Sequence, residues 1–263
     1  MASNSISHRI KRIFFNRNEQ SEIGGATNDS FLLAPDGLPL PSKELVFLVT
    51  GQYDQNAFYE NSLVGISSIK EILEKNRSHL SDFKSVLDFG CGCGRIIRHW
   101  KNFKNANIVG LDYNPVFLDF CRRSFPFARF GINEFDKPLT CPDETFDFIY
   151  AISVFTHLPE NLQFFWINEL QRVLKPGGYI YMTTHGKSRI NAPHLTEIDR
   201  ENFMKGNVII YNDTMKGTNY CGTYHPESYI RGKLAKDFIV VDFIPDGAKD
   251  AGQDAYLLKK PMT

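Results

Sequence analysis

The sequence lacks net charge and long apolar runs, and each absence excludes a class of protein. Lysine and arginine together number 30, and so do aspartate and glutamate, so the formal net charge of the 263 residues is zero. A general nucleic-acid binder normally carries a basic surplus, so we expect no nucleic-acid partner. No segment approaches the roughly 20 apolar residues of a membrane helix. No apolar run follows the N-terminal charges, so no secretory signal is predicted.

Cysteine is scarce, and its count of five is odd. None of the cysteines has the paired spacing of a zinc site, and no disulfide framework is evident. Free thiols are typical of a reducing compartment, so we expect a cytoplasmic protein without a bound metal. The remaining composition is that of a globular protein, with 42% hydrophobic and 23% charged residues.

The first 18 residues contain four basic residues and no acid, and their apolar residues recur at helical spacing. A basic amphipathic helix of this kind can lie on a membrane surface or cover a partner. The alternative is a frayed tail or a helix packed on the domain, which the short length favours. We interpret residues 1–59 as a basic arm and cap, and residues 60–263 as the main domain.

Strand and helix signals alternate from residue 60 onward. This alternation predicts a parallel sheet covered by helices on both faces. Residues 186–224 lack clear periodicity and form an insertion of a length that is often functional. Strands are expected at 85–89, 108–112, 127–132, 146–152, 179–184, 238–244 and 255–258, and helices from 60, at 95–103, and from Pro115, Pro159 and His225.

The strongest motif runs from an apolar strand through a glycine-rich turn, Val86-Leu-Asp-Phe-Gly-Cys-Gly-Cys-Gly-Arg95. Its glycines allow a tight bend and a close approach of the backbone to a ligand. A nicotinamide-binding turn spaces its glycines G-x-G-x-x-G, whereas the third glycine comes one residue early in this motif, and no G-K-[ST] of a P-loop follows. Asp88 would sit badly beside a pyrophosphate but suits an amino group. The turn therefore favours a cofactor with no phosphates and a cationic amino acid end.

A second acid, Asp112, closes the next strand. A carboxylate at this place can accept hydrogen bonds from both ribose hydroxyls, as in dinucleotide folds. Tyr113 follows it and is a candidate to lie against an adenine ring.

These residues resemble the class I S-adenosylmethionine-dependent methyltransferases. Residues 146–158 resemble the family's fourth strand and the loop after it, and residues 170–178 its "R-x-L-K-P-G-G" turn. The ending at residues 252–261 resembles a subgroup of uncharacterised bacterial methyltransferases. The resemblance implies an α/β, Rossmann-like fold with a seven-stranded, mostly parallel sheet whose last strand is antiparallel. The site would lie at the carboxyl ends of the strands.

The resemblance also implies roles for residues at these strand ends. Asn133 matches the position that usually contacts adenine, and Ser153 would present its backbone near the methionine part of the cofactor. The expected S-adenosyl-L-methionine site comprises Asp88, Gly90, Cys91, Gly92, Gly94, Asp112, Tyr113, Asn133 and Ser153.

Two histidines, His157 and His185, lie at the expected rim of the site and are candidate general bases for a hydroxyl acceptor. The alternative for each is a structural role. The Asn/Asp-Pro-Pro-Tyr/Phe motif, which the resemblance links to amino groups of bases and glutamine, is missing after the fourth strand. We therefore expect a small-molecule acceptor, with a hydroxyl of a glycan or secondary metabolite preferred. The alternative is a non-catalytic S-adenosylmethionine-binding or partner-binding module, because fold does not determine activity.

Overall fold

The computed structural model describes residues 32–218 and 220–262. Leu33–Thr263 form one compact unit. The predicted basic segment of the first 18 residues lies outside the described residues, so its proposed membrane or partner contact stays a prediction. Within the described ranges, no helix is long and apolar enough to cross a membrane.

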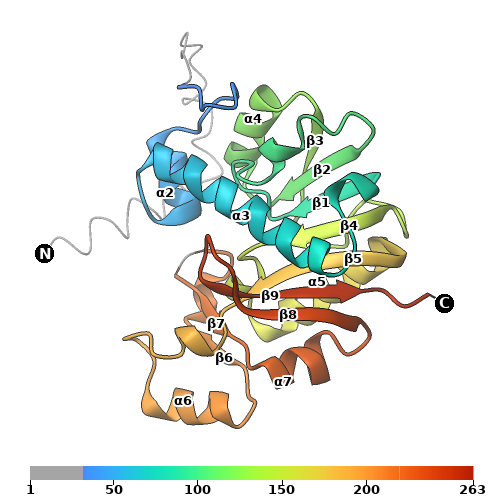
Figure 1. Cartoon of the computed structure of the whole chain (residues 1–263). Helices are drawn as coiled ribbons and strands as arrows, with labels where there is room; N and C mark the ends of the chain where they lie inside the picture. The colour runs from blue at the N-terminus through green and yellow to red at the C-terminus, as the bar shows by residue number, and fades with distance from the viewer. Residues whose placement is uncertain (1–31, 219, 263) are drawn as a thin grey trace, which may run out of the picture. The chain divides into compact units, whose positions relative to one another are not determined.

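Seven strands form one sheet in the order β3-β2-β1-β4-β5-β9-β8 (Figure 1). β9 pairs antiparallel with both of its neighbours, β5 and β8, whereas the other pairs in the sheet are parallel. The predicted mostly parallel sheet with a reversed last strand is therefore confirmed. The strands are β1 Ser85–Phe89, β2 Asn107–Asp112, β3 Ala128–Ile132, β4 Phe146–Ala151, β5 Leu174–Thr184, β8 Ile239–Ala248 and β9 Gln253–Lys259.

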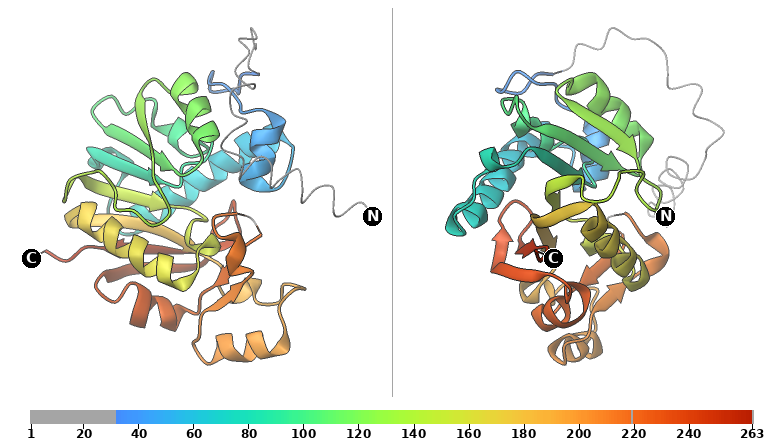
Figure 2. Two further views of the ribbon diagram at one scale, coloured as in Figure 1. Left: turned by 180° about the vertical axis from the view of Figure 1, so that it is seen from behind. Right: turned by 90° about the vertical axis from the view of Figure 1, so that its right-hand side faces the viewer.

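Successive side chains of the buried strands pack on opposite faces of the sheet. In β4, Phe148 and Tyr150 join the core under α2 (Lys43–Thr50), α3 (Gln55–Lys75) and α4 (Pro115–Ser124). Ile149 and Ala151 join the core under α5 (Glu160–Val173). The edge-on view shows α3 and α5 on opposite sides of the sheet (Figure 2), as predicted for helices on both faces.

Side-chain caps determine where the helices begin. α3 starts at Gln55, five residues before the predicted start, because the Asp54 carboxylate accepts the backbone N–H groups of Asn56 and Ala57. α4 starts where predicted, with Pro115 in the first turn and the Asn114 side chain accepting the Val116 N–H.

The prediction of a helix at residues 95–103 is wrong. This segment forms turns and a short 3-10 helix, Ile97–Trp100. Its side chains make tertiary contacts: buried Arg98 binds both carboxylate oxygens of Asp36 at 2.7 and 3.0 Å, and His99 Nε2 lies 2.9 Å from Ser62 Oγ. Such contacts override helix propensity.

Residues 186–224 contain short elements with a small core of their own. α6 (Glu197–Met204) precedes the two-stranded pair β6 (Ile209–Tyr211) and β7 (Gly222–Tyr224), and α7 (Glu227–Tyr229) follows. In the described residues of this range, no helix or strand exceeds eight residues, which explains the missing periodicity in the sequence. The small core consists of Ile190, Leu195, Phe203, Ile209 and Tyr224.

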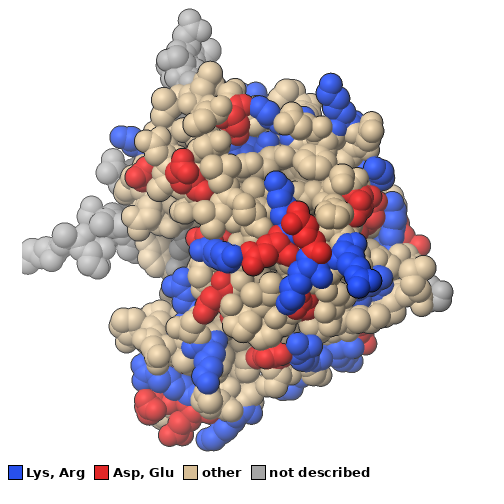
Figure 3. Space-filling view, viewed as in Figure 1, with Lys and Arg blue, Asp and Glu red and all other residues tan. Residues whose placement is uncertain are grey.

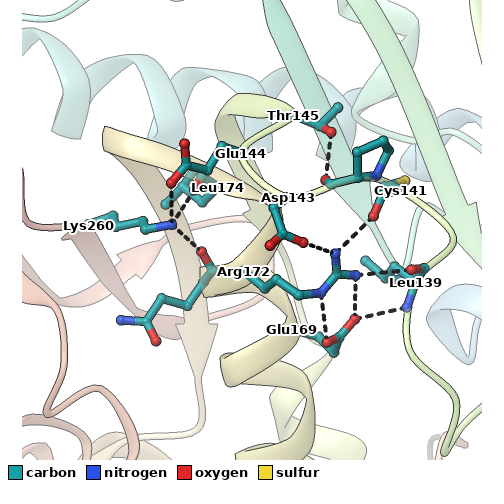
Figure 4. A network of polar contacts seen from close by, with 11 residues as sticks. Leu139, Cys141, Asp143, Glu144, Thr145, Glu169, Arg172, Leu174 and Lys260 are labelled. Carbon is teal, nitrogen blue, oxygen red and sulfur yellow. Dashed lines mark hydrogen bonds and ion pairs between the residues drawn. The ribbon is translucent and has the colours of Figure 1, made fainter. Parts of the chain in front are cut away.

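The arginine of the "R-x-L-K-P-G-G" turn is a structural clamp (Figure 4). The Arg172 guanidinium binds both carboxylate oxygens of Glu169, at 3.0 and 2.8 Å. It also donates to the carbonyls of Leu139 and Cys141, each at 3.0 Å, and to the Asp143 carboxylate at 2.7 Å. The loop before β4 is thereby fastened to α5.

Opposite charges are interspersed on the face that carries α3 and β8 (Figure 3). Lys75 pairs with Asp242 at 2.9 Å, and Lys249 pairs with Glu71 at 2.5 Å. Exposed pairs of this kind contribute little stability. On this face, basic side chains therefore form ion pairs with neighbouring acidic side chains.

We predict that Arg172→Ala lowers the free energy of unfolding by about 2 kcal/mol, because five hydrogen bonds to a charged group are lost. Urea denaturation measures this change. In the control variant Arg122→Ala, an exposed pair with Asp119 is lost, and the expected change is about 0.5 kcal/mol or less. Equal effects of the two substitutions would contradict the assignment.

Candidate functional site

The carboxyl ends of the parallel strands meet at one edge of the sheet, where the strand order reverses between β1 and β4. Ligands of open α/β sheets bind at such switch points. The predicted residues follow the ends of five strands. Asp88 and the glycine turn belong to β1, Asp112 to β2, Asn133 to β3, Ser153 to β4 and His185 to β5.

The turn after β1 requires its glycines. Gly90, Gly92 and Gly94 have φ angles of +76°, +51° and +71°, a region that other residues rarely adopt. A Cβ on Gly90 would lie 2.4 Å from Val154 Cγ2, and one on Gly94 would lie 2.3 Å from Phe125 Cε2. The predicted tight turn is therefore present in the backbone, whereas the close approach to a ligand stays a prediction.

The Asp112 carboxylate holds this turn in place. It accepts the Gly92 N–H at 2.8 Å and the Asn114 N–H at 2.9 Å. The Leu111 carbonyl accepts the N–H groups of Gly90 and Cys91. Burial raises the pKa of Asp112 to about 6, although the hydrogen bonds that its carboxylate accepts from backbone N–H groups act in the opposite direction.

Asp88 is a second buried acid of the same region. Burial raises its pKa to about 8, and the neighbouring Asp112 adds to the rise, while Tyr150 and Arg95 oppose it. Arg95 forms an ion pair with the buried Asp250 carboxylate, so its charge is already shared. The Asp88 carboxyl is therefore buried without a cation of its own among the described residues, and burial of a charged carboxylate without compensation is costly.

Asn133 lies at the end of β3, and Tyr113 lies at the end of β2. The Asn133 N–H donates to the Asp112 carbonyl at 3.1 Å. Its buried side-chain oxygen Oδ1 has no hydrogen-bond partner within residues 32–218 and 220–262, so it can accept a hydrogen bond from a ligand. The Tyr113 hydroxyl donates to the Gly217 carbonyl at 2.8 Å, and its ring lies 4.6 Å from that of Phe135.

Ser153 is held in a left-handed conformation with φ +57°. Its N–H donates to Thr183 Oγ1 at 2.8 Å, and its hydroxyl donates to Gln253 Oε1 at 3.1 Å. Thr183 donates to the same Gln253 oxygen at 2.6 Å. Sequence reasoning missed Thr183 and Gln253 as partners of Ser153. The resemblance of the ending at 252–261 was the one signal that could have indicated Gln253.

His157 is held by two bonds to residues near the end of the 186–224 insertion. Its Nδ1 lies 2.7 Å from the Cys221 carbonyl, and its own carbonyl accepts the Gly217 N–H at 2.7 Å. Because a carbonyl only accepts, Nδ1 carries the proton and Nε2 keeps a free lone pair. Burial lowers the pKa of His157, so the ring is neutral near pH 7.

His185 lies beside His157, with ring centroids 6.3 Å apart and the rings almost perpendicular. Burial lowers the pKa of His185 to about 3, and the neighbouring His157 and Arg189 add to the effect. Burial thus keeps the His185 ring neutral near pH 7, and its buried Nδ1 is left without a partner in the described part of the chain.

Aromatic residues at and before the start of α3 have structural surroundings. Phe58 and Tyr59 belong to the core, and Tyr53 stacks on Phe47. Burial raises the pKa of the Cys91 thiol, so it stays protonated. In the part of the chain that the structure describes, no group of three or more histidine, cysteine or acidic residues is placed to hold a metal ion.

Comparison with known proteins identifies the fold family. Residues 87–182 match the family model described as "Methyltransferase domain". This stretch matches a methyltransferase domain, and the fold is the one seen in S-adenosylmethionine-dependent methyltransferases of known structure. The chain superposes on Burkholderia thailandensis 1,6-didemethyltoxoflavin-N1-methyltransferase, a structure with bound S-adenosylhomocysteine, with a TM-score of 0.54 and 15% identity. The match covers 84% of this chain and 86% of that one.

Two sequence relatives share the methyltransferase domain over part of their length. The fatty-acid O-methyltransferase of Mycolicibacterium smegmatis is 34% identical over 112 residues, which cover 42% of this chain and 40% of the relative. The sterol 24-C-methyltransferase erg-4 of Neurospora crassa is 34% identical over 120 residues, which cover 41% of this chain and 31% of the relative. The chain thus spans less than half the length of these relatives.

We predict that Asp88→Asn stabilises the ligand-free protein increasingly as pH rises. With a folded pKa of about 8 and an ordinary value of 3.8, the wild-type carboxyl favours folding most at low pH, and this contribution is lost as pH rises to about 8. The uncharged asparagine avoids this loss. Thermal denaturation should show a gain in Tm that is about 10 °C larger at pH 9 than at pH 5.

The matched control for this prediction is Asp119→Asn, which alters an exposed carboxylate on α4. Its Tm difference from the wild type should not depend on pH. A gain for Asp88→Asn that is equal at both pH values would show that the Asp88 carboxyl is not perturbed by burial.

Proposed function

We propose that the domain transfers a methyl group from S-adenosylmethionine to a hydroxyl oxygen of a small-molecule acceptor. The bound cofactor would supply the methyl group on a sulfonium, so the protein chiefly aligns donor and acceptor. The glycan or secondary-metabolite hydroxyl expected from the sequence remains the preferred acceptor class.

The described residues fit this cofactor. Asp88 would face the ammonium group of the amino acid end, because its buried carboxyl has no dedicated cation. Asp112 would accept the ribose hydroxyls, and the unpartnered Asn133 Oδ1 would accept the adenine amino group. The backbone of Gly90, Cys91, Gly92 and Gly94 would lie along the cofactor, with Ser153 near its methionine part.

The orientation of His157 is the observation that carries the proposal. The Cys221 carbonyl fixes the proton on Nδ1 and leaves Nε2 free to take the proton of an acceptor hydroxyl. A depressed pKa keeps the ring unprotonated, which a base requires. His185, at a centroid distance of 6.3 Å, would bind and orient the same acceptor.

The need for a base favours an oxygen acceptor. The compared proteins are named as O-, C- and N-methyltransferases, so the acceptor atom must be inferred from this chain's own site. An amine or a thiolate would need less help with proton removal than a hydroxyl does. An oriented neutral histidine is therefore most useful to a hydroxyl acceptor.

We predict that His157→Gln slows methyl transfer by about 100-fold or more, because the proton acceptor is lost. A screen with isotope-labelled S-adenosylmethionine and fractionated cell metabolites identifies the acceptor, and its kcat is then compared between wild type and variant. Calorimetric titration with S-adenosylhomocysteine should give the same affinity for both proteins.

The control His79→Gln changes an exposed histidine that precedes a 3-10 helix at Leu80–Asp82. It should transfer as fast as the wild type. Binding of the cofactor without transfer to any fraction would contradict the proposal and favour the non-catalytic module. Equal kcat for His157→Gln and wild type would remove His157 as the base.

A further inference from the structure

One residue of the insertion links the two halves of the site. We define the Gly217 turn as residues 213–218. The Gly217 carbonyl accepts the Tyr113 hydroxyl at 2.8 Å, and the Gly217 N–H donates to the His157 carbonyl at 2.7 Å. Tyr113 directly follows the proposed ribose ligand, so the turn joins the cofactor half to the candidate base.

The same part of the chain also holds the His157 ring. The Cys221 N–H donates to the Thr218 carbonyl at 3.0 Å, which ties Cys221 to the Gly217 turn. The Cys221 carbonyl in turn bonds to His157 Nδ1 at 2.7 Å. Both the backbone and the ring of His157 therefore depend on where the Gly217 turn lies.

The turn fits closely against its neighbours. Gly217 has a φ of +75°, and a Cβ at this position would lie 2.3 Å from Phe135 Cζ. The Phe135 ring packs on Tyr113, at a centroid distance of 4.6 Å, and Lys216 Nζ lies 5.7 Å from the centre of the same ring. Tyr113 thus supports the turn both through its hydroxyl and through Phe135.

We propose that Tyr113 is a positioning residue whose hydroxyl holds the Gly217 turn where the Cys221 carbonyl orients the His157 ring. The inference rests on the proposed function, in which His157 is the proton acceptor. A half-buried tyrosine hydroxyl that donates to a backbone carbonyl contributes a directional bond. Without this bond, the turn can shift, and Cys221 no longer selects the His157 tautomer with a free Nε2.

Burial raises the pKa of Tyr113, so its hydroxyl remains a donor at physiological pH. The hydroxyl and the ring of Tyr113 therefore have separable roles. The ring is the part that the sequence makes a candidate to lie against adenine, whereas the hydroxyl bonds to Gly217 of the insertion. Replacing Tyr113 by phenylalanine removes the hydroxyl and its bond to Gly217 and keeps the ring.

The test is Tyr113→Phe, read out by the ring nitrogens of His157 in ¹⁵N nuclear magnetic resonance. The His157 signals are assigned by their loss in His157→Gln. In the wild type, we expect one tautomer with the proton on Nδ1. In Tyr113→Phe, we expect tautomer mixing or exchange broadening, a fall in kcat of about tenfold from misplacement of the base, and unchanged affinity for S-adenosylhomocysteine.

The matched control is Tyr220→Phe, which removes an exposed tyrosine hydroxyl from the same insertion and should leave the His157 signals unchanged. A second variant, Gly217→Ala, should reproduce the tautomer mixing because its Cβ meets Phe135. Unchanged His157 nitrogens in Tyr113→Phe would overturn the inference, as would equal changes in Tyr220→Phe. If the wild type methylates no acceptor, the proposed function fails, while the nitrogen signals still decide the role of Tyr113.

Discussion

The carboxyl groups of Asp88 and Asp112 are buried at the ends of adjacent strands, and their mutual repulsion adds to the effect of burial on Asp88. Burying acids costs free energy unless a cation or hydrogen bonds compensate. Asp112 is compensated by the Gly92 and Asn114 N–H groups, and this hydrogen bonding shapes the glycine turn. Asp88 has less compensation. The arrangement therefore favours a ligand that brings positive charge to β1 and hydroxyl donors to β2.

The second half of the site depends on chain segments that come later. The ends of β4 and β5 supply Ser153 and His185, and the insertion supplies the carbonyl that orients His157. The Gly217 turn binds both His157 and Tyr113, so the proposed base and the proposed cofactor half share one support. The fold thus places two buried carboxyl groups in one half of the candidate site and two neutral imidazoles in the other.

The fold and the shape of the glycine turn could be predicted from local sequence because their signals are local. The strand at 85–89, the three positive-φ glycines and Asp112 lie within one β-turn-β unit. The partners of His157 could not be predicted, since Cys221 lies 64 residues away and contributes a backbone carbonyl, which every residue type offers. The wrong prediction of a helix at 95–103 has a similar cause, because the ion pair of Arg98 with the distant Asp36 outweighs the local helix propensity.

Proton release on cofactor binding tests the role of the buried acids most directly. Titration calorimetry with S-adenosylhomocysteine, in buffers of different ionisation enthalpy, counts the protons released. At pH 7, the wild type should release about one proton, because Asp88 is protonated when free and ionised beside the ligand's ammonium group. Asp88→Asn should release none. Binding by the wild type without proton release at pH 7 would contradict the account.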